Sequence, residues 1–173
     1  LLLPAMQDSP LPANRHAQNA LADRLGALAL RTQSGAPTSA VAAQVSGKRY
    51  TFDQNEDGVT AVQLDFDKQG GARLTLTDSR GEHQIPSGYQ RWAAGRALLD
   101  QPPHEFDLRP TATSGAWTTD DTYTMRLSFN ETPFIPTLSF RFVDDRMEYR
   151  KRYNVGFGPP EALESPLLVG KQA

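Results

Sequence analysis

The stretch that decides the fold is residues 122–153, TYTMRLSFNETPFIPTLSFRFVDDRMEYRKRY. Apolar and polar side chains alternate along it with a period of two, which is typical of strands with one buried and one solvent-exposed face. Asp144 and Asp145 stand between two such runs, and both residue types tolerate the positive φ of a tight hairpin. The stretch therefore predicts antiparallel strands joined by short turns.

The same alternation extends upstream, over residues 49–52, 62–67 and 73–77, with turn signals about every ten residues. A one-residue slip would turn every apolar side chain of such a strand outward, so the register is well determined. Residues 92–117 are harder to interpret, because prolines and glycines interrupt them, and we expect one or two further strands there. The chain is predicted to be mainly β, an antiparallel up-and-down barrel of about eight strands, since closure removes exposed strand edges.

The first 47 residues differ in composition from the rest, with few charges and many Ala, Leu, Pro and Ser. Leu21, Leu25 and Leu28 recur at spacings of four and three, which predicts one amphipathic helix over about residues 14–29. We therefore divide the chain into residues 1–47, a linker with this helix, and residues 48–173, the barrel. The apolar start at Leu1 suggests an excised or processed piece, not a translated start.

Composition excludes several classes of protein. The chain has 173 residues, 18 basic and 20 acidic side chains, and no cysteine. Its net charge of −2 argues against nucleic-acid binding, which needs a clustered excess of Lys and Arg. No apolar run approaches the roughly 18–20 residues of a membrane span. The lack of cysteine excludes disulfides and leaves the compartment open, with the bacterial periplasm or cell envelope favoured over the cytoplasm.

One segment resembles a calcium-binding loop. Asp53, Asn55, Asp57 and Gly58 fit the first six positions of the pattern, but the twelfth position holds Leu64 where a bidentate Glu is required. The flanking segments also alternate as strands. We therefore expect a hairpin loop between the first two strands, with Asn55 and Gly58 in turn conformations.

Catalytic motifs are absent from the sequence. His16, His83 and His104 are isolated from one another and from paired carboxylates, so no metal site is expected. No serine has a lysine three residues later, and neither a G-x-S-x-G elbow nor a phosphate-binding glycine loop occurs. The chain alone is predicted to be neither an enzyme nor the carrier of a cofactor.

The basic cluster Arg150-Lys151-Arg152 with Arg146 permits two interpretations. The arginines share the outer strand face and can pair with acids on a neighbouring strand. Lys151 points with Tyr149 and Tyr153 toward the interior, where it can reach a rim carboxylate or an anionic ligand.

Aromatic side chains are the other candidates for a binding site. They could line a ligand cavity in the barrel mouth, or they could fill the core, which is favoured because eight strands enclose a space only just wide enough for side chains. The candidate ligand-binding residues are Trp92, Trp117, Tyr149 and Lys151.

Several short strings together resemble the C-terminal region of bacterial beta-lactamase-related, penicillin-binding-protein-like serine hydrolases. They are LLPAM at 2–6, DSPLP at 8–12, SGKRY at 46–50 followed by Asn55 and Gly58, Gly88 with Trp92, Trp117 with DDT at 120–122, ETPF at 131–134 and NVGFGP at 154–159. The resemblance implies a lipocalin-like barrel that follows a serine hydrolase catalytic domain of the same parent protein. No catalytic residue can be carried over, because the S-x-x-K serine and lysine belong to that upstream domain.

Two hypotheses of function follow. In the first, the chain is a non-catalytic accessory domain that shapes substrate access to the upstream active site, with the segment Pro102 to Ser114 as its arm. The alternative is a free-standing lipocalin-like barrel that binds a small apolar ligand in its interior. Fluorescence of Trp92 and Trp117 during titration with apolar probes would distinguish the two.

Overall fold

The computed structural model describes residues 12–98, 108–156 and 158–173. The chain divides into two compact units, one ending at Arg31 and the other running from Thr32 to Ala173. Within the described ranges, every helix is too short or too polar to cross a lipid bilayer.

The first unit contains the predicted amphipathic helix, α1 (Arg15–Gly26). It begins at Asn14, whose side-chain oxygen accepts a hydrogen bond from the backbone N–H of Ala17 at 3.0 Å, as an N-cap residue does. The helix ends three residues earlier than predicted, at Gly26, a residue with low helix propensity. Leu21, Leu25 and Leu28 are all exposed.

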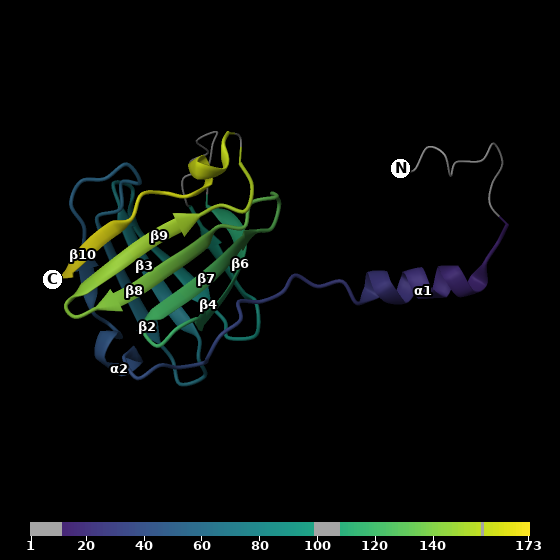
Figure 1. Ribbon diagram of the computed structural model, residues 1–173, viewed down its shortest axis with the longest axis horizontal. Coiled ribbons are helices and arrows are strands. Elements are labelled where there is room, and N and C mark those ends of the chain that lie inside the picture. Colours follow the sequence, from purple (N-terminus) through teal and green to yellow (C-terminus); the bar gives the residue numbers. More distant parts are fainter. Residues whose placement is uncertain (1–11, 99–107, 157) are drawn as a thin grey trace. The chain divides into compact units, whose positions relative to one another are not determined.

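The second unit is a single sheet of ten antiparallel strands rolled into a nearly closed barrel, in the order β4-β3-β2-β1-β10-β9-β8-β7-β6-β5 (Figure 1). This confirms the predicted mainly β, up-and-down architecture. The strands are β1 (Arg49–Thr51), β2 (Ala61–Phe66), β3 (Ala72–Asp78), β4 (Gly81–Ser87), β5 (Ala93–Ala97), β6 (Arg109–Trp117), β7 (Thr122–Phe129), β8 (Thr137–Val143), β9 (Arg146–Arg152) and β10 (Leu168–Gln172).

The predicted strand number, about eight, is too low. Between residues 92 and 117, where one or two strands were expected, there are two, β5 and β6, but β4 and β10 were not predicted. Strand β4 (GEHQIPS) contains a proline and mostly polar residues, and β10 (LVGKQ) has only two large apolar residues, so neither shows a clear alternation. Tertiary pairing with β3 and β9 determines these strands.

Strands β4 and β5 face each other in the barrel wall, but among the described residues no ladder of backbone hydrogen bonds joins them. We call the line between these two strands the seam. These strands stand at the two ends of the strand order, and the described residues include no register between them. Two isolated bridges close the wall near it: Gly88 pairs with Ser114, and Ala36 pairs with Trp117. The backbone N–H of Ala36 donates to the carbonyl of Trp117 at 2.8 Å, and the reverse bond measures 3.0 Å.

The bridge at Ala36 also moves the boundary of the barrel unit. The sequence placed residues 32–47 with the linker, whereas the compact unit begins at Thr32. Besides the bridge, α2 (Ala42–Val45) buries Ala42 and Val45 in the core next to β2. This short helix was not predicted, because four residues are too few to show a helical period.

The turns have the predicted chemistry. Asp144 has a φ of 53° in the hairpin between β8 and β9, and Gly70 has a φ of 83° between β2 and β3. In the β1–β2 loop, Gly58 has a φ of 66° and the Asn55 side chain bonds both the N–H and the carbonyl of Val59. The hairpin-loop interpretation of residues 53–58 is therefore confirmed.

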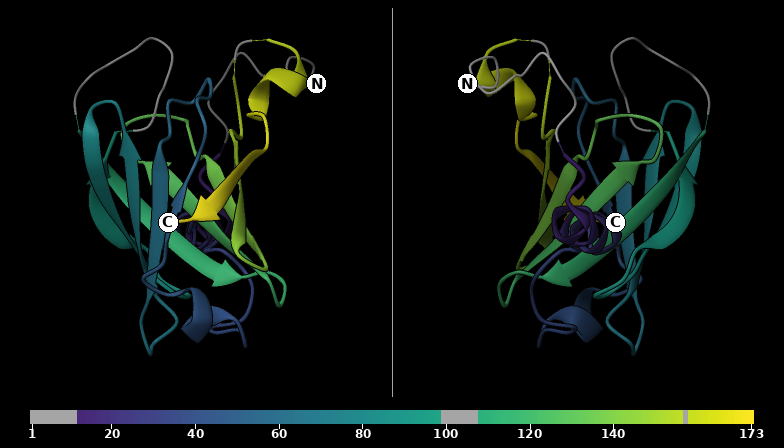
Figure 2. Two further views of the ribbon diagram at one scale, coloured as in Figure 1. Left: turned by 90° about the vertical axis from the view of Figure 1, so that its left-hand side faces the viewer. Right: turned by 90° about the vertical axis from the view of Figure 1, so that its right-hand side faces the viewer.

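The two ends of the barrel differ (Figure 2). At one end, the α2 end, α2 lies beside the turns that join β2 to β3 and β8 to β9. The other end, the η2 end, carries the β1–β2 loop and the 3-10 helix η2 (Pro160–Leu163). Strand β9 ends and strand β6 begins at the η2 end, because strands alternate in direction around the barrel.

Candidate functional site

The α2 half of the barrel interior is filled by an aromatic cluster. Phe66 lies 4.9 Å, between ring centroids, from both Trp117 and Tyr123, and Phe142 lies 5.8 Å from Trp117. Burial raises the pKa of Tyr123 to about 12, although its hydroxyl donates to Ser87 Oγ at 3.4 Å. The rings pack against one another and occupy most of this half of the interior.

Strand β9 places Lys151 inside the barrel, near the η2 end. Along β9, Met147, Tyr149 and Lys151 are buried, whereas Arg150 and Arg152 are exposed. The predicted orientation of the basic cluster is thereby confirmed. Tyr149 stacks on Phe140, and burial raises the pKa of Tyr149 far above its ordinary value.

The partner of Lys151 is a rim carboxylate, that of Asp57 in the β1–β2 loop. The ammonium donates to Asp57 Oδ1 at 2.9 Å, and the Ser165 hydroxyl donates to the same oxygen at 3.3 Å. The ammonium also lies 5.9 Å from the ring centroid of Tyr153. Asp57 Oδ2 is buried, and no partner for it exists among the described residues.

Strand β6 places two further polar groups inside the barrel. Thr111 and Thr113 share the inward face of β6 with Trp117, and they are 1% and 0% exposed. Neither hydroxyl has a hydrogen-bond partner in the described part of the chain. The register pairs Thr111 with Gly95 and Thr113 with Ala93, so the neighbouring positions on β5 are small. Two unsatisfied hydroxyls therefore face small residues of β5, with the ring of Pro86 beside Gly95.

The four candidate residues from the sequence fall into two places. Trp117 lies in the aromatic cluster, and Tyr149 and Lys151 also face the interior, so the structure brings these three into the barrel. Trp92 lies half-buried on the outside, at the rim of a surface pocket, and does not join them.

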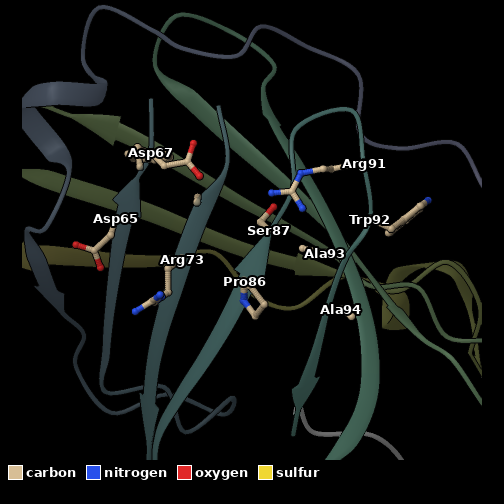
Figure 3. A pocket seen from close by; sticks show the side chains of 11 residues that line it. Asp65, Asp67, Arg73, Pro86, Ser87, Arg91, Trp92, Ala93 and Ala94 are labelled. Atoms are coloured by element: carbon tan, nitrogen blue, oxygen red, sulfur yellow. The ribbon is translucent and has the colours of Figure 1, made fainter. Parts of the chain in front are cut away.

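That surface pocket, which we call the seam pocket, lies next to the seam and has a volume of about 520 Å³. Four charged residues line it, Asp65, Asp67, Arg73 and Arg91, together with Phe66, Pro86 and Ser87 among others. In Figure 3, Arg91 extends over the pocket above Ser87, Asp67 points in from the β2 side, and Trp92 points away. The size is typical of small-molecule sites.

The sequence missed Asp57 as the partner of Lys151, both threonines and the whole seam pocket. Asp57 was noticed only within the calcium-like pattern, and no group of three His, Asp or Glu side chains in the described ranges is placed to hold a metal ion. Of the predicted access arm, residues 102–107 lie outside the described residues, as does His104, and the arm's last six residues belong to β6. The accessory role itself stays a prediction.

Comparisons with known proteins support a barrel fold. No family model and no curated protein matches the chain. A solved structure of a fatty acid-binding protein from brain tissue of Drosophila melanogaster is similar over 73% of this chain and 98% of that chain, with 14% identity and a TM-score of 0.51. A second solved structure, of the REP1-NXSQ fatty acid transporter, is similar over 76% of this chain and 97% of that chain, with 10% identity and a TM-score of 0.50. At such identities the likeness shows the fold alone, and the chain thus has the lipocalin-like up-and-down barrel fold predicted from its sequence.

Proposed function

We propose that the chain is a non-enzymatic barrel that binds a small apolar molecule in the half of its interior nearer the η2 end. The observation that carries the proposal is the pair of buried hydroxyls of Thr111 and Thr113, which face the interior without a partner. Leaving a buried polar group unpaired costs about 1–3 kcal/mol, so a ligand that supplies an acceptor oxygen gains by filling this position.

The shape of the barrel supports this location. An eight-stranded barrel is just wide enough for side chains, and barrel diameter grows with strand number, so ten strands enclose a wider interior. The aromatic cluster fills the α2 half. Toward the η2 end, the inward positions of β5 are Ala93, Gly95 and Ala97, which are small, and the ring of Pro86 packs beside Gly95.

The similar structures support the choice of probe. Their names describe fatty acid binding and fatty acid transport. A fatty acid combines an apolar chain with acceptor oxygens, as the apolar interior and the two threonine hydroxyls require. A medium or long fatty acid is therefore the first ligand to test.

The two tryptophans provide a built-in test. Trp117 reports on the interior in a Trp92→Phe variant, and Trp92 reports on the outside in a Trp117→Phe variant. Titration with decanoate, palmitate and oleate should change the emission of Trp117 saturably. A flat response of Trp117 to all three, confirmed by calorimetry, would overturn the proposal.

The threonines provide a matched pair of variants. The double variant Thr111→Val/Thr113→Val keeps side-chain shape and removes both hydroxyls, so decanoate affinity should fall about tenfold. Thr75 is also buried, but it lies on the outer face of β3, and Thr75→Val should leave the affinity unchanged. Equal decanoate affinities of the unaltered protein, the double variant and Thr75→Val would exclude the two threonines as the polar contact.

A further inference from the structure

We infer that the seam pocket is a second binding site, specific for small organic carboxylates with an apolar body. The inference goes beyond the proposed function, because it concerns a different site with different residues. It rests on the composition of the pocket and on which of its polar groups already have partners.

The pocket is lined from both faces of the barrel wall. Asp65, Arg73 and Pro86 form one cross-strand row in register, on the outer face of β2, β3 and β4. The next row, Phe66, Ala72 and Ser87, faces the interior. Ala93 and Ala94 complete the lining from β5, across the seam. A ligand can thus place an apolar body between these strands and keep a charged group at the surface.

The cationic groups of the pocket are unpaired. Within the described ranges, neither the Arg73 nor the Arg91 guanidinium has a hydrogen bond or an ion pair. Asp65 is the direct register partner of Arg73, yet no ion pair within 4.0 Å joins them. Each guanidinium presents five N–H donors in a planar fork that fits a carboxylate with two parallel hydrogen bonds.

The anionic groups, in contrast, are already engaged. Asp67 Oδ1 accepts from the backbone N–H groups of Gln69 at 2.7 Å and Gly71 at 2.9 Å, which holds the β2–β3 turn. The Asp65 carboxylate accepts from the side-chain amide of Gln63 at 3.1 and 3.3 Å. Apart from Asp67 Oδ2, the unmet hydrogen-bonding capacity among the described side chains of the pocket consists mainly of the guanidinium donors of Arg73 and Arg91, so an anion is the complementary ligand.

Ser87 adds a buried donor to the same pocket. It is 5% exposed, and its hydroxyl oxygen accepts from Tyr123, which leaves its own hydrogen available. With Arg91 above it (Figure 3), this hydroxyl can bond one carboxylate oxygen while the guanidinium bonds the other. The pocket volume of about 520 Å³ accommodates a carboxylate that bears one ring or a short alkyl chain.

Three probes of one shape and different charge test the inference by titration calorimetry. Benzoate should bind at least tenfold more tightly than benzyl alcohol, its neutral counterpart, and benzylammonium should not bind measurably. The benzoate affinity should fall as salt is raised, because the arginines are exposed. Equal or tighter binding of benzylammonium would show that the carboxylates dominate the pocket, and would overturn the inference.

Variants then assign the binding to this pocket. Arg73→Gln and Arg91→Gln should each weaken benzoate about tenfold, whereas Arg146→Gln, an exposed arginine of β9 outside the pocket, should change nothing. Far-UV circular dichroism checks that all three fold alike. Benzoate binding that survives both pocket substitutions lies elsewhere, and this result also overturns the inference.

The proposal of the interior site and that of the seam pocket can be refuted separately. The decanoate response of Trp117 should persist in Arg91→Gln, and benzoate binding should persist in Thr111→Val/Thr113→Val. Absence of benzoate binding with an intact fatty acid response would remove the seam pocket alone. Absence of the fatty acid response would remove only the interior site.

Discussion

Lys151 and Asp57 lie 94 residues apart in the sequence, yet the ammonium of one donates to Oδ1 of the other at 2.9 Å. Their side chains are 7% and 15% exposed, so both charges are largely removed from water. The pair ties the β1–β2 loop to the end of β9. Because removal of one member of a buried ion pair leaves the other charge uncompensated, the pair governs the stability of the η2 end.

Replacement of Lys151 by methionine should lower the free energy of unfolding by about 3–5 kcal/mol, because Asp57 stays buried without a counter-charge. The double variant Asp57→Leu/Lys151→Met should recover most of the loss. Urea unfolding measures both, with Lys171→Met, an exposed lysine of β10, as the control. A Lys151→Met protein as stable as the control would contradict the pairing.

Alkaline pH should destabilise the barrel through its buried tyrosines. Burial raises the pKa values of Tyr50, Tyr123 and Tyr149, and that of Tyr123 reaches about 12. The unfolded chain therefore loses these protons first, and stability present below about pH 10 is lost as the pH rises toward 12, by roughly 3 kcal/mol for Tyr123. Urea unfolding between pH 8 and 12 should show a shallower decline in Tyr123→Phe. Parallel declines in the two proteins would refute the assignment.

Acidic pH should destabilise the barrel through protonation of Asp78 at the β3–β4 turn. Burial opposes ionisation of this carboxyl, but hydrogen bonds from Arg80 and His83 outweigh burial and lower its pKa to about 2. The stability that the group contributes is present above about pH 4 and is lost as the pH falls through 2, by roughly 2–3 kcal/mol. Asp78→Asn should be less stable at pH 7 and should flatten the acid limb of the stability profile. Asp145→Asn, at an exposed position, should leave the profile unchanged.

The close packing at Gly115 predicts a steric effect. A Cβ atom at this position would overlap the hydroxyl of Tyr123 and Oγ of Ser87. Gly115→Ala should therefore destabilise the barrel by about 1–3 kcal/mol, as over-packed cores do, and Tyr123→Phe in the same chain should relieve part of the cost. Thermal unfolding measures the series. A Cβ at Gly26 would meet open space, so Gly26→Ala should not destabilise the chain.

The sequence predicted the strands whose inner and outer faces differ in polarity. In β7, Tyr123, Met125 and Leu127 alternate with Thr124 and Arg126, and the barrel keeps that order. Strand β4 was missed because Pro86 and its polar neighbours break the alternation. Its place is set by pairing with β3, which is information that the local sequence does not carry.

Only those features of the candidate sites that depend on a single strand could be predicted from the sequence. The inward direction of Lys151 follows from its position next to Tyr149 and Arg150, but nothing local identifies Asp57 as its partner. Thr111 and Thr113 became visible only when β6 was placed between β5 and β7. The seam pocket joins residues from four strands and two turns, and such convergence depends on the closed barrel.

The absence of a ladder between β4 and β5, among the strands described, has a kinetic consequence. A small molecule that leaves the interior along this line would have to displace Pro86 from Gly95 but would break no ladder, so its release need not wait for global unfolding. The dissociation rate of an interior ligand should then respond to substitutions beside the seam more strongly than the folding equilibrium does. Amide protons on the facing edges of β4 and β5 should likewise exchange with solvent by local opening, before those of the central strands.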